Sequence, residues 1–142
     1  MPAGGAVIAA AIHAATRRQE PAIVGFLTAG FPSRDKFRTH LAAVASAADV
    51  VEVGVPFTDP MADGMTIQRA SHAALQAGVT LKWILSELAA LTPRPAAPLV
   101  LMSYLNPLLA YGLDRLPEDA ARAGVAGFII PDLPYEESAD MR

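Results

Sequence analysis

The sequence predicts an α/β protein in which the strands of one parallel sheet alternate with helices. Four short apolar runs have the length and the β-prone composition of buried strands, namely residues 22–28, 49–54, 99–104 and 125–130. Segments with apolar residues at helical spacing separate these runs. Strands that alternate with helices pair in parallel through right-handed crossovers, so we expect one sheet covered by helices.

The composition fits one compact domain over residues 1–142. Hydrophobic residues make up 53% of the chain and charged residues 18%, as expected for a chain that buries a core. The formal net charge of −3 gives no reason to expect nucleic acid or an anionic membrane as a partner. The lack of cysteine excludes disulfides, thiolate metal sites and cysteine nucleophiles.

The apolar residues 6–15 do not form a secretory signal or a membrane span. Arg17 and Arg18 follow the apolar part, whereas a secretory signal has its basic residues before it. The run is also far shorter than a membrane span. We therefore expect a cytoplasmic location.

Two helices surround the first strand. One covers residues 6–18 and is ended by Pro21. The strand over residues 22–28 leads into a second helix, for which Ser33 is a candidate N-cap. The apolar face of that helix consists of Phe37, Leu41, Val44 and Ala48.

Two further helices are expected between the second and third strands. The first begins near Gly64 and ends at Gly78, and Thr80 caps the second. Trp83 lies beside the apolar stripe of the second helix, so we expect it to be partly exposed. The proline-rich residues 92–98 end this helix. Its buried stripe consists of Leu81, Ile84, Leu85, Leu88 and Leu91.

After the third strand, the dipeptide Asn106-Pro107 is expected to turn the chain, and residues 108–111 form a brief apolar piece. Pro117 begins a helix that precedes the fourth strand. A last helix is expected over residues 135–141.

Two architectures fit this order, an open doubly wound sheet and a (β/α)8 barrel. A doubly wound nucleotide-binding protein has a glycine-rich turn after its first strand. Residues 29–32 read AGFP and lack the G-x-G-x-x-G spacing. Candidate functional residues instead lie at the carboxyl ends of the strands, as in the barrel. They are Phe26, Thr28, Glu52, Tyr104 and Asp132.

Residues 49–69 contain the candidate acid pair. An ionised Glu52 inside an apolar strand is costly to bury without partners, so it either reaches water at a rim or has a function. The loop after this strand adds Asp59 and Asp63. Glu52 lies on the strand and Asp63 at the far end of its loop. Two carboxylates in such different settings can have their pKa values separated, as acid–base chemistry requires.

The segment VEVGVPFTDPMADGMTIQRA, residues 51–70, resembles the signature of the tryptophan synthase alpha subunit family. That signature has a hydrophobic–Glu–hydrophobic–Gly strand, then Pro-Phe-(Ser/Thr)-Asp-Pro, Ala-Asp-Gly and Ile-Gln. Residues 26–33, 101–107 and 127–138 also resemble strand ends of the family, in the same order.

The resemblance implies a fold as well. The family fold is an eight-stranded barrel with a helix closing its bottom, and residues 6–18 would be that helix. A complete (β/α)8 barrel takes about 250 residues. We therefore expect this chain to be the first half of such a barrel, without the phosphate-binding loops of the second half.

The resemblance further implies a reaction, the last step of tryptophan biosynthesis. The family cleaves indole-3-glycerol phosphate to indole and glyceraldehyde 3-phosphate by a retro-aldol reaction without cofactor or metal. By resemblance, Glu52 protonates indole C3 and handles the hydroxyl proton, and Asp63 accepts the indole N–H hydrogen bond. Phe26, Tyr104 and Ile129 match positions that line the indole pocket, although packing inside a barrel explains them equally well.

A partner is implied too. The family forms a heterotetramer of two alpha and two beta subunits, in which indole passes to a beta subunit that holds pyridoxal phosphate. The loops after the second and third strands face that partner in the family. Asp59 is interpreted as a loop-structuring or partner-contacting residue rather than a third catalytic acid. The implied interface consists of Pro56, Asp59, Pro60, Asn106 and Pro107.

The sequence is also compatible with other functions. A metal site at Glu52, Asp59 and Asp63 is weakly supported, because no histidine lies nearby in the sequence and the spacing matches no known ligand pattern. Another barrel isomerase or synthase of tryptophan or histidine biosynthesis would share the fold, but the continuous signature argues against it. The missing phosphate loops leave open a non-catalytic half-barrel that only folds or associates with a partner. We expect the 142-residue chain alone to be inactive.

Overall fold

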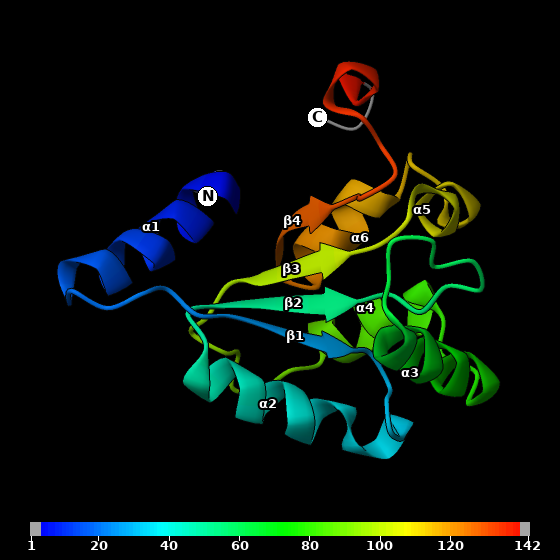
Figure 1. The fold of residues 1–142 in the computed structure, drawn as a ribbon, viewed down its shortest axis with the longest axis horizontal. Helices are drawn as coiled ribbons and strands as arrows, with labels where there is room; N and C mark the ends of the chain where they lie inside the picture. Colours follow the sequence, from blue (N-terminus) through cyan, green and yellow to red (C-terminus); the bar gives the residue numbers. More distant parts are fainter. Residues whose placement is uncertain (1–3, 140–142) are drawn as a thin grey trace.

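The computed structural model describes residues 4–139 and contains one sheet of four parallel strands (Figure 1). The strand order is β1-β2-β3-β4, so neighbours in the sequence are neighbours in the sheet. A doubly wound sheet reverses its strand order, whereas a barrel does not. The barrel prediction is therefore confirmed. The strands are β1 (Val24–Thr28), β2 (Val50–Gly54), β3 (Leu99–Met102) and β4 (Val125–Ile129).

Helices lie between the strands in the predicted alternation. Within the described residues, two short helices separate β2 from β3 and two more separate β3 from β4. The helices are α1 (Gly4–Arg17), α2 (Phe37–Ala47), α3 (Met65–Gln76), α4 (Leu81–Ala89), α5 (Leu105–Tyr111) and α6 (Leu116–Arg122). Two 3-10 turns occur at Arg34–Lys36 and Tyr135–Glu137. No helix among residues 4–139 is both long enough and apolar enough to cross a membrane. The cytoplasmic location stays a prediction.

The hydrophobic core lies between the helices and one face of the sheet, which we call the outer face. Val51 and Val53 of β2 and Leu101 of β3 are completely buried there. Alternate residues of a strand point to opposite faces, so Glu52 lies on the other side, the inner face. The helices contribute Phe37, Leu41, Ile84, Leu85, Leu88 and Leu108 to the same cluster.

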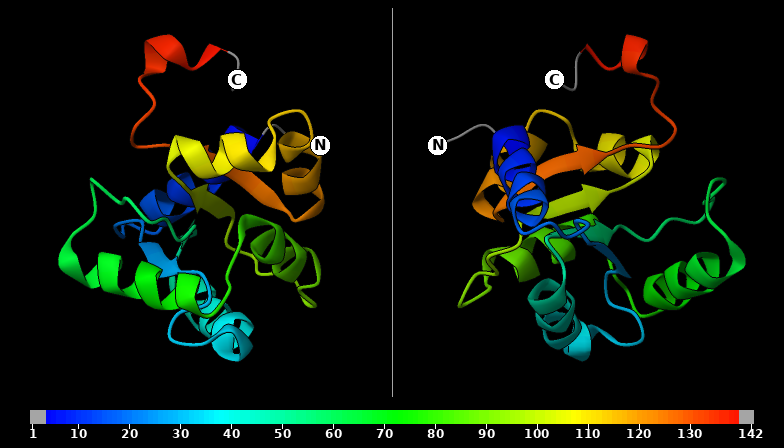
Figure 2. Two further views of the ribbon diagram at one scale, coloured as in Figure 1. Left: turned by 90° about the vertical axis from the view of Figure 1, so that its right-hand side faces the viewer. Right: turned by 60° about the vertical axis from the view of Figure 1, so that its left-hand side comes forward.

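Helix α1 lies beyond the amino-terminal ends of the strands, apart from the other helices (Figures 1 and 2). A Cβ atom added at Gly4 would stand only 1.7 Å from the carbonyl oxygen of Ala126, and one at Gly127 would lie 3.5 Å from the Cδ1 atom of Ile8. The start of α1 is thus in contact with β4. This is the placement expected of a helix that closes the bottom of a barrel.

The predicted ends of the middle helices are confirmed. The Oγ1 atom of Thr80 accepts a hydrogen bond of 3.1 Å from the backbone N–H of Trp83, which caps α4. Gly78 has a positive φ of 77°, the left-handed conformation typical after a helix. Trp83 is half-buried, with its ring 5.4 Å from that of Phe37 and 4.9 Å from the guanidinium carbon of Arg34.

One turn prediction is wrong. Asn106-Pro107 does not turn the chain, because α5 begins at Leu105 and continues through both residues. Proline is tolerated in the first turn of a helix, where no backbone N–H is needed. The N–H of Leu105 is satisfied by the Oδ1 atom of Asp132, at 2.9 Å. This cap comes from the loop after β4, and no local pattern in the sequence reveals it.

Two other local predictions differ from the structure. Ser33 precedes the 3-10 turn at Arg34–Lys36 rather than α2, and its side chain makes no capping hydrogen bond. The helix expected over residues 135–141 is a 3-10 turn at Tyr135–Glu137. The rest of that prediction, from residue 140 onward, lies outside the described residues.

Candidate active site

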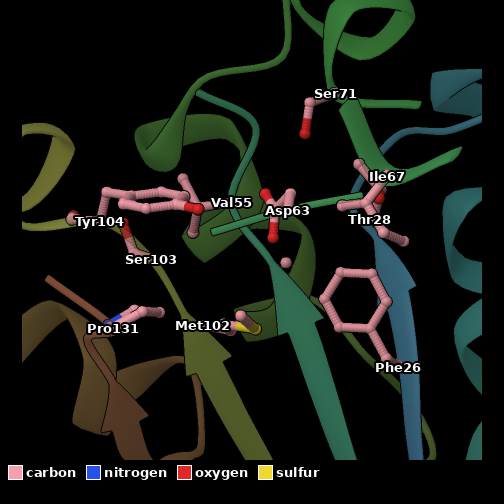
Figure 3. Close-up of a pocket in the computed structure, with 11 residues that line it drawn as sticks. Phe26, Thr28, Val55, Asp63, Ile67, Ser71, Met102, Ser103, Tyr104 and Pro131 are labelled. Carbon is pink, nitrogen blue, oxygen red and sulfur yellow. Dashed lines mark hydrogen bonds between the residues drawn. The ribbon is translucent and has the colours of Figure 1, made fainter. Parts of the chain in front are cut away.

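A pocket lies at the carboxyl-terminal ends of the strands, between the sheet, the start of α3 and the loop that joins β2 to α3 (Figure 3). It contains about 290 Å³ of empty space, part of which is open to solvent. Its enclosed part is only about 10 Å³, room for roughly one water molecule. Its lining consists of Phe26, Thr28, Gly54, Val55, Asp63, Ile67, Ser71, Met102, Ser103, Tyr104 and Pro131.

Asp63 is the acid of this pocket. Its backbone is fixed on both sides, because its N–H donates to the carbonyl of Pro60 at 3.1 Å and its own carbonyl accepts from the Nε2 atom of Gln68 at 2.8 Å. Burial raises the pKa of the Asp63 carboxyl above its usual value, and a hydrogen bond from Tyr104 partly opposes this rise. A carboxyl group with a raised pKa, held by a rigid backbone, is suited to interact with a developing positive charge.

Tyr104 places its hydroxyl group at the same loop. Its ring is almost completely buried, with 4% of the residue exposed. The hydroxyl oxygen accepts a hydrogen bond of 2.8 Å from the backbone N–H of Ala62. The ring also contacts Phe57, with 5.4 Å between the ring centroids. Tyr104 therefore joins the end of β3 to the loop that positions Asp63.

Phe26 covers the floor of the pocket. Its ring lies across the end of β2, where a Cβ atom added at residue 54 would stand 2.6 Å from the Cζ atom of Phe26. Only glycine leaves room for the ring at that position. Gly54 is thus part of the site, although the sequence suggested only that it ends the strand.

Glu52 lies on the inner face beside this pocket but does not line it. Glu52 precedes Gly54 by two residues on β2. Its strand partners are Phe26 on β1 and Val100 on β3. The residue is half-buried. Among the described residues, no hydrogen bond or ion pair involves its carboxylate. Ile129 also lies outside the pocket lining, where it pairs with Met102 and is 38% exposed.

The structure therefore brings Phe26, Asp63 and Tyr104 together around one pocket, with Glu52 and Ile129 on the same face next to it. Thr28, a candidate from its place at a strand end, is a buried polar residue of the lining. Two further buried polar residues of the lining, Ser71 and Ser103, were not expected from the sequence. Ser103 lies just after the end of β3, a position that could have identified it. Ser71 belongs to the regular pattern of α3 and gives no such signal.

The residues expected at a partner interface lie on the rim of this end, with different exposures. Pro56 is buried, Pro60 and Pro107 are half-buried, and Asp59 and Asn106 are exposed. The Oγ1 atom of Thr58 donates to the Oδ2 atom of Asp59 at 2.6 Å. Across residues 4–139, no group of three or more histidine, aspartate or glutamate side chains is placed to hold a metal ion.

A sheet of sequential parallel strands, with a carboxyl group in a pocket at their carboxyl ends, has the architecture of the (β/α)8-barrel enzymes. The family model described as "Tryptophan synthase alpha chain" matches residues 12–142. The chain therefore belongs to the tryptophan synthase alpha chain family, and its four strands are the first half of the barrel.

Individual relatives agree with this assignment. The chain is 54% identical over 132 residues to the tryptophan synthase alpha chain of Nitratidesulfovibrio vulgaris, covering 92% of this chain and 51% of the relative. It resembles the solved alpha subunit of Legionella pneumophila with a TM-score of 0.86 at 34% identity, over 94% of this chain and 52% of that one. It also resembles tryptophan synthase from M. tuberculosis in its aminoacrylate-bound form, with a TM-score of 0.88 at 34% identity. This match covers 95% of this chain and 55% of that one. The chain spans about half the length of the relatives it matches.

Proposed function

We propose that this chain is the acid-bearing half of a tryptophan synthase alpha subunit, a lyase of tryptophan biosynthesis. The complete enzyme would cleave indole-3-glycerol phosphate to indole and glyceraldehyde 3-phosphate. The observation that supports this most directly is the arrangement of Glu52 and Asp63. One lies on β2 and the other at the end of its loop, both beside a pocket with aromatic walls.

The reaction requires proton transfers that these two acids can perform. Glu52 gives a proton to C3 of the indole ring, which leaves the ring nitrogen with positive charge. The carboxylate of Glu52 then takes the proton of the side-chain hydroxyl. As that oxygen becomes a carbonyl, the carbon–carbon bond breaks and its electron pair returns to the ring, which gives indole and the aldehyde. Asp63 accepts a hydrogen bond from the ring N–H and stabilises the charge on it.

The other residues of the pocket suit a flat aromatic substrate. Phe26 and Tyr104 offer ring surfaces on opposite sides of Asp63 (Figure 3). Glu52, which has no hydrogen-bond partner among the described residues, is free to exchange protons with a bound molecule. We propose that these steps use no cofactor in this chain.

A beta subunit is the proposed partner, and pyridoxal phosphate would belong to it. The rim of the pocket end exposes apolar side chains as well as the residues named from the sequence. Met61 is 83% exposed at the tip of the loop after β2, and Leu109 of α5 is 49% exposed. Exposed apolar groups of this kind often mark protein-binding surfaces, which supports an interface at Asp59, Pro60, Asn106 and Pro107. Pro56, expected at the same interface, is buried.

The test uses a completed barrel, made by joining this chain to the second half of the Nitratidesulfovibrio vulgaris relative. Glu52→Gln keeps the side-chain volume but removes the acid, so indole release should fall by about 10²–10⁴-fold. Glu87→Gln is the control. Glu87 of α4 forms an ion pair with Arg38 of α2, away from the pocket, so this variant should leave the rate unchanged. A Glu52→Gln variant that keeps more than about a tenth of the rate would exclude this acid–base role.

A second candidate function, association without catalysis, is favoured by the two edge strands. β1 and β4 are the two edge strands of the sheet, and within the described residues each has a strand neighbour on one side alone. Apolar residues at or next to these strands are partly exposed: Ile23 by 54%, Val24 by 48% and Ile129 by 38%. Apolar strand edges recruit other chains. We therefore expect residues 1–142 alone to elute from gel filtration as an associated species and to release no indole. A compact monomer that releases indole would contradict both expectations.

A further inference from the structure

We propose that Tyr104 is a positioning residue whose hydroxyl group holds Asp63 in its working place. This inference rests on the proposed function, in which Asp63 acts on the substrate. From the sequence, Tyr104 is expected only as an aromatic wall of the pocket, whereas in the structure its hydroxyl group also contacts the loop of Asp63.

The direction of the hydrogen bonds supports the proposal. A phenol group has one proton to donate and an oxygen that accepts. The Tyr104 oxygen accepts from the backbone N–H of Ala62 at 2.8 Å, so its own proton remains available. The next residue along the chain is Asp63, and Figure 3 shows the hydroxyl group directed toward its carboxylate. A hydrogen bond from this hydroxyl favours the ionised form of Asp63.

Tyr104 is itself anchored far better than the loop it holds. Only 4% of it is exposed, and it lies between the end of β3 and the first residue of α5. The loop that contains Asp63 is mostly exposed between Thr58 and Ala62. Tyr104 contacts this loop at Phe57, through the rings, and at Ala62, through the hydroxyl group. The other hydrogen bonds of this loop are local, within the loop and to the start of α3. Tyr104 ties the loop to a rigid strand end, which is how supporting residues keep a functional group in place.

The variant Tyr104→Phe tests the role of the hydroxyl group alone, because it keeps the ring. Hydrogen exchange of the Ala62 amide in the chain should become roughly five- to tenfold faster, since one hydrogen bond is lost. The pKa of Asp63, followed by carboxyl NMR, should rise above its wild-type value. In the completed barrel, kcat for indole release should fall about tenfold with little change in KM. The acid limb of its pH profile should move to higher pH.

Tyr111→Phe is the matched control. It removes the same hydroxyl group from a tyrosine whose partner is Asp119, on α6, outside the pocket. This variant should change neither the exchange of Ala62, nor the titration of Asp63, nor the pH profile. An equal response in both variants would show a general loss of stability and would overturn the proposal.

A second measurement needs no variant. In the wild-type chain, the amide chemical shift of Ala62 should titrate together with the Asp63 carboxyl group, because the Tyr104 hydroxyl connects them. An Ala62 signal that does not respond to this titration would overturn the proposal, even if Tyr104→Phe failed to fold.

The outcomes separate this inference from the proposed function. If Asp63→Asn abolishes indole release while Tyr104→Phe leaves Ala62, Asp63 and the rate unchanged, the positioning role is wrong and the proposed function stands. If Tyr104→Phe loosens Ala62 and shifts Asp63 while Asp63→Asn keeps full activity, the contact is real and the proposed function is wrong.

Discussion

Two aspartates at opposite ends of β2 show how the two ends of this sheet differ. Asp49 directly precedes β2 at the amino-terminal end. Its Oδ2 atom accepts from the backbone N–H of Ile23 at 2.9 Å and its Oδ1 atom from Arg18 at 3.0 Å. The hydrogen bond from Ile23, with that from Arg18, holds the pKa of Asp49 below its usual value. Asp49 thus joins the segment after α1 to the start of two strands.

Asp63 lies beyond the other end of β2 and has the opposite electrostatic character. Burial raises the pKa of its carboxyl group, and no cationic side chain is paired with it among the described residues. A fully paired carboxylate stabilises the fold, whereas one kept in an environment that disfavours its charge is available for chemistry. The amino-terminal end of the sheet is therefore structural and the carboxyl-terminal end is the proposed site, as in other barrels of this kind.

The largest expected effect is that of Asp63→Asn on activity. The amide cannot stabilise a positive charge on the indole ring, so indole release by the completed barrel should fall by about 10²–10⁴-fold. The free energy of unfolding should stay the same or increase, because the variant no longer holds a partly buried charge. Asp49→Asn should leave the rate nearly unchanged. Equal losses of activity in both variants would remove the distinction between the two ends.

A smaller effect is expected on stability when Asp49 is replaced. Asp49→Ala removes the acceptor for Ile23 and the partner of Arg18, so the thermal midpoint of unfolding should fall. The titration of Asp63 should not change. Asp114→Ala is the control, since Asp114 is exposed and makes no hydrogen bond with the described residues. A midpoint for Asp49→Ala equal to that of the control would show that Asp49 does not stabilise the start of the sheet.

The two aspartates should also give opposite dependences of stability on pH. The pKa of Asp49 is lowered, so its contribution is present above the usual value of 3.8 and is lost as pH falls through the lowered pKa. The pKa of Asp63 is raised, so its protonated form favours folding below 3.8, and this contribution is lost as pH rises through the raised pKa.

Thermal midpoints measured across this acidic range can test the prediction. The gap between wild type and Asp49→Ala should close toward low pH. The thermal midpoint of Asp63→Asn should increase relative to that of wild type as pH rises above 3.8. The difference in thermal midpoint between wild type and variant should rise with pH for Asp49→Ala and fall with pH for Asp63→Asn. Changes of the same sign for both variants would contradict the opposite pKa shifts of the two aspartates.

The smallest effect on the chain itself is expected for Asp59→Lys, within the same loop as Asp63. Asp59 is exposed and its side chain bonds only to the neighbouring Thr58 among the described residues. The substitution should hardly change the thermal midpoint or the titration of Asp63, but it should weaken binding of a beta subunit in a titration. Unchanged affinity would remove this residue from the proposed interface.

Most of the fold could be predicted from the sequence because local patterns determine it. The alternation of apolar strands and amphipathic helices predicted a parallel sheet, and Thr80 and Gly78 marked helix ends where the structure has them. The path through Asn106 and Pro107 could not be predicted in this way. Helix α5 is capped by Asp132, which lies in a distant loop, and a proline in a first helical turn resembles a proline in a turn.

The sequence by itself determined the identity of the acids and the family to which the chain belongs, because both depend on residue types at fixed spacing. Tertiary structure alone decided what surrounds each acid. The spacing of Asp49 and Asp63 does not reveal that Ile23 and Arg18 meet one of them and that Tyr104 meets the other. Hydrogen bonds and burial join residues that are distant along the chain, and they fix the direction of each pKa shift. The chemistry available to a carboxyl group is therefore a property of the folded protein.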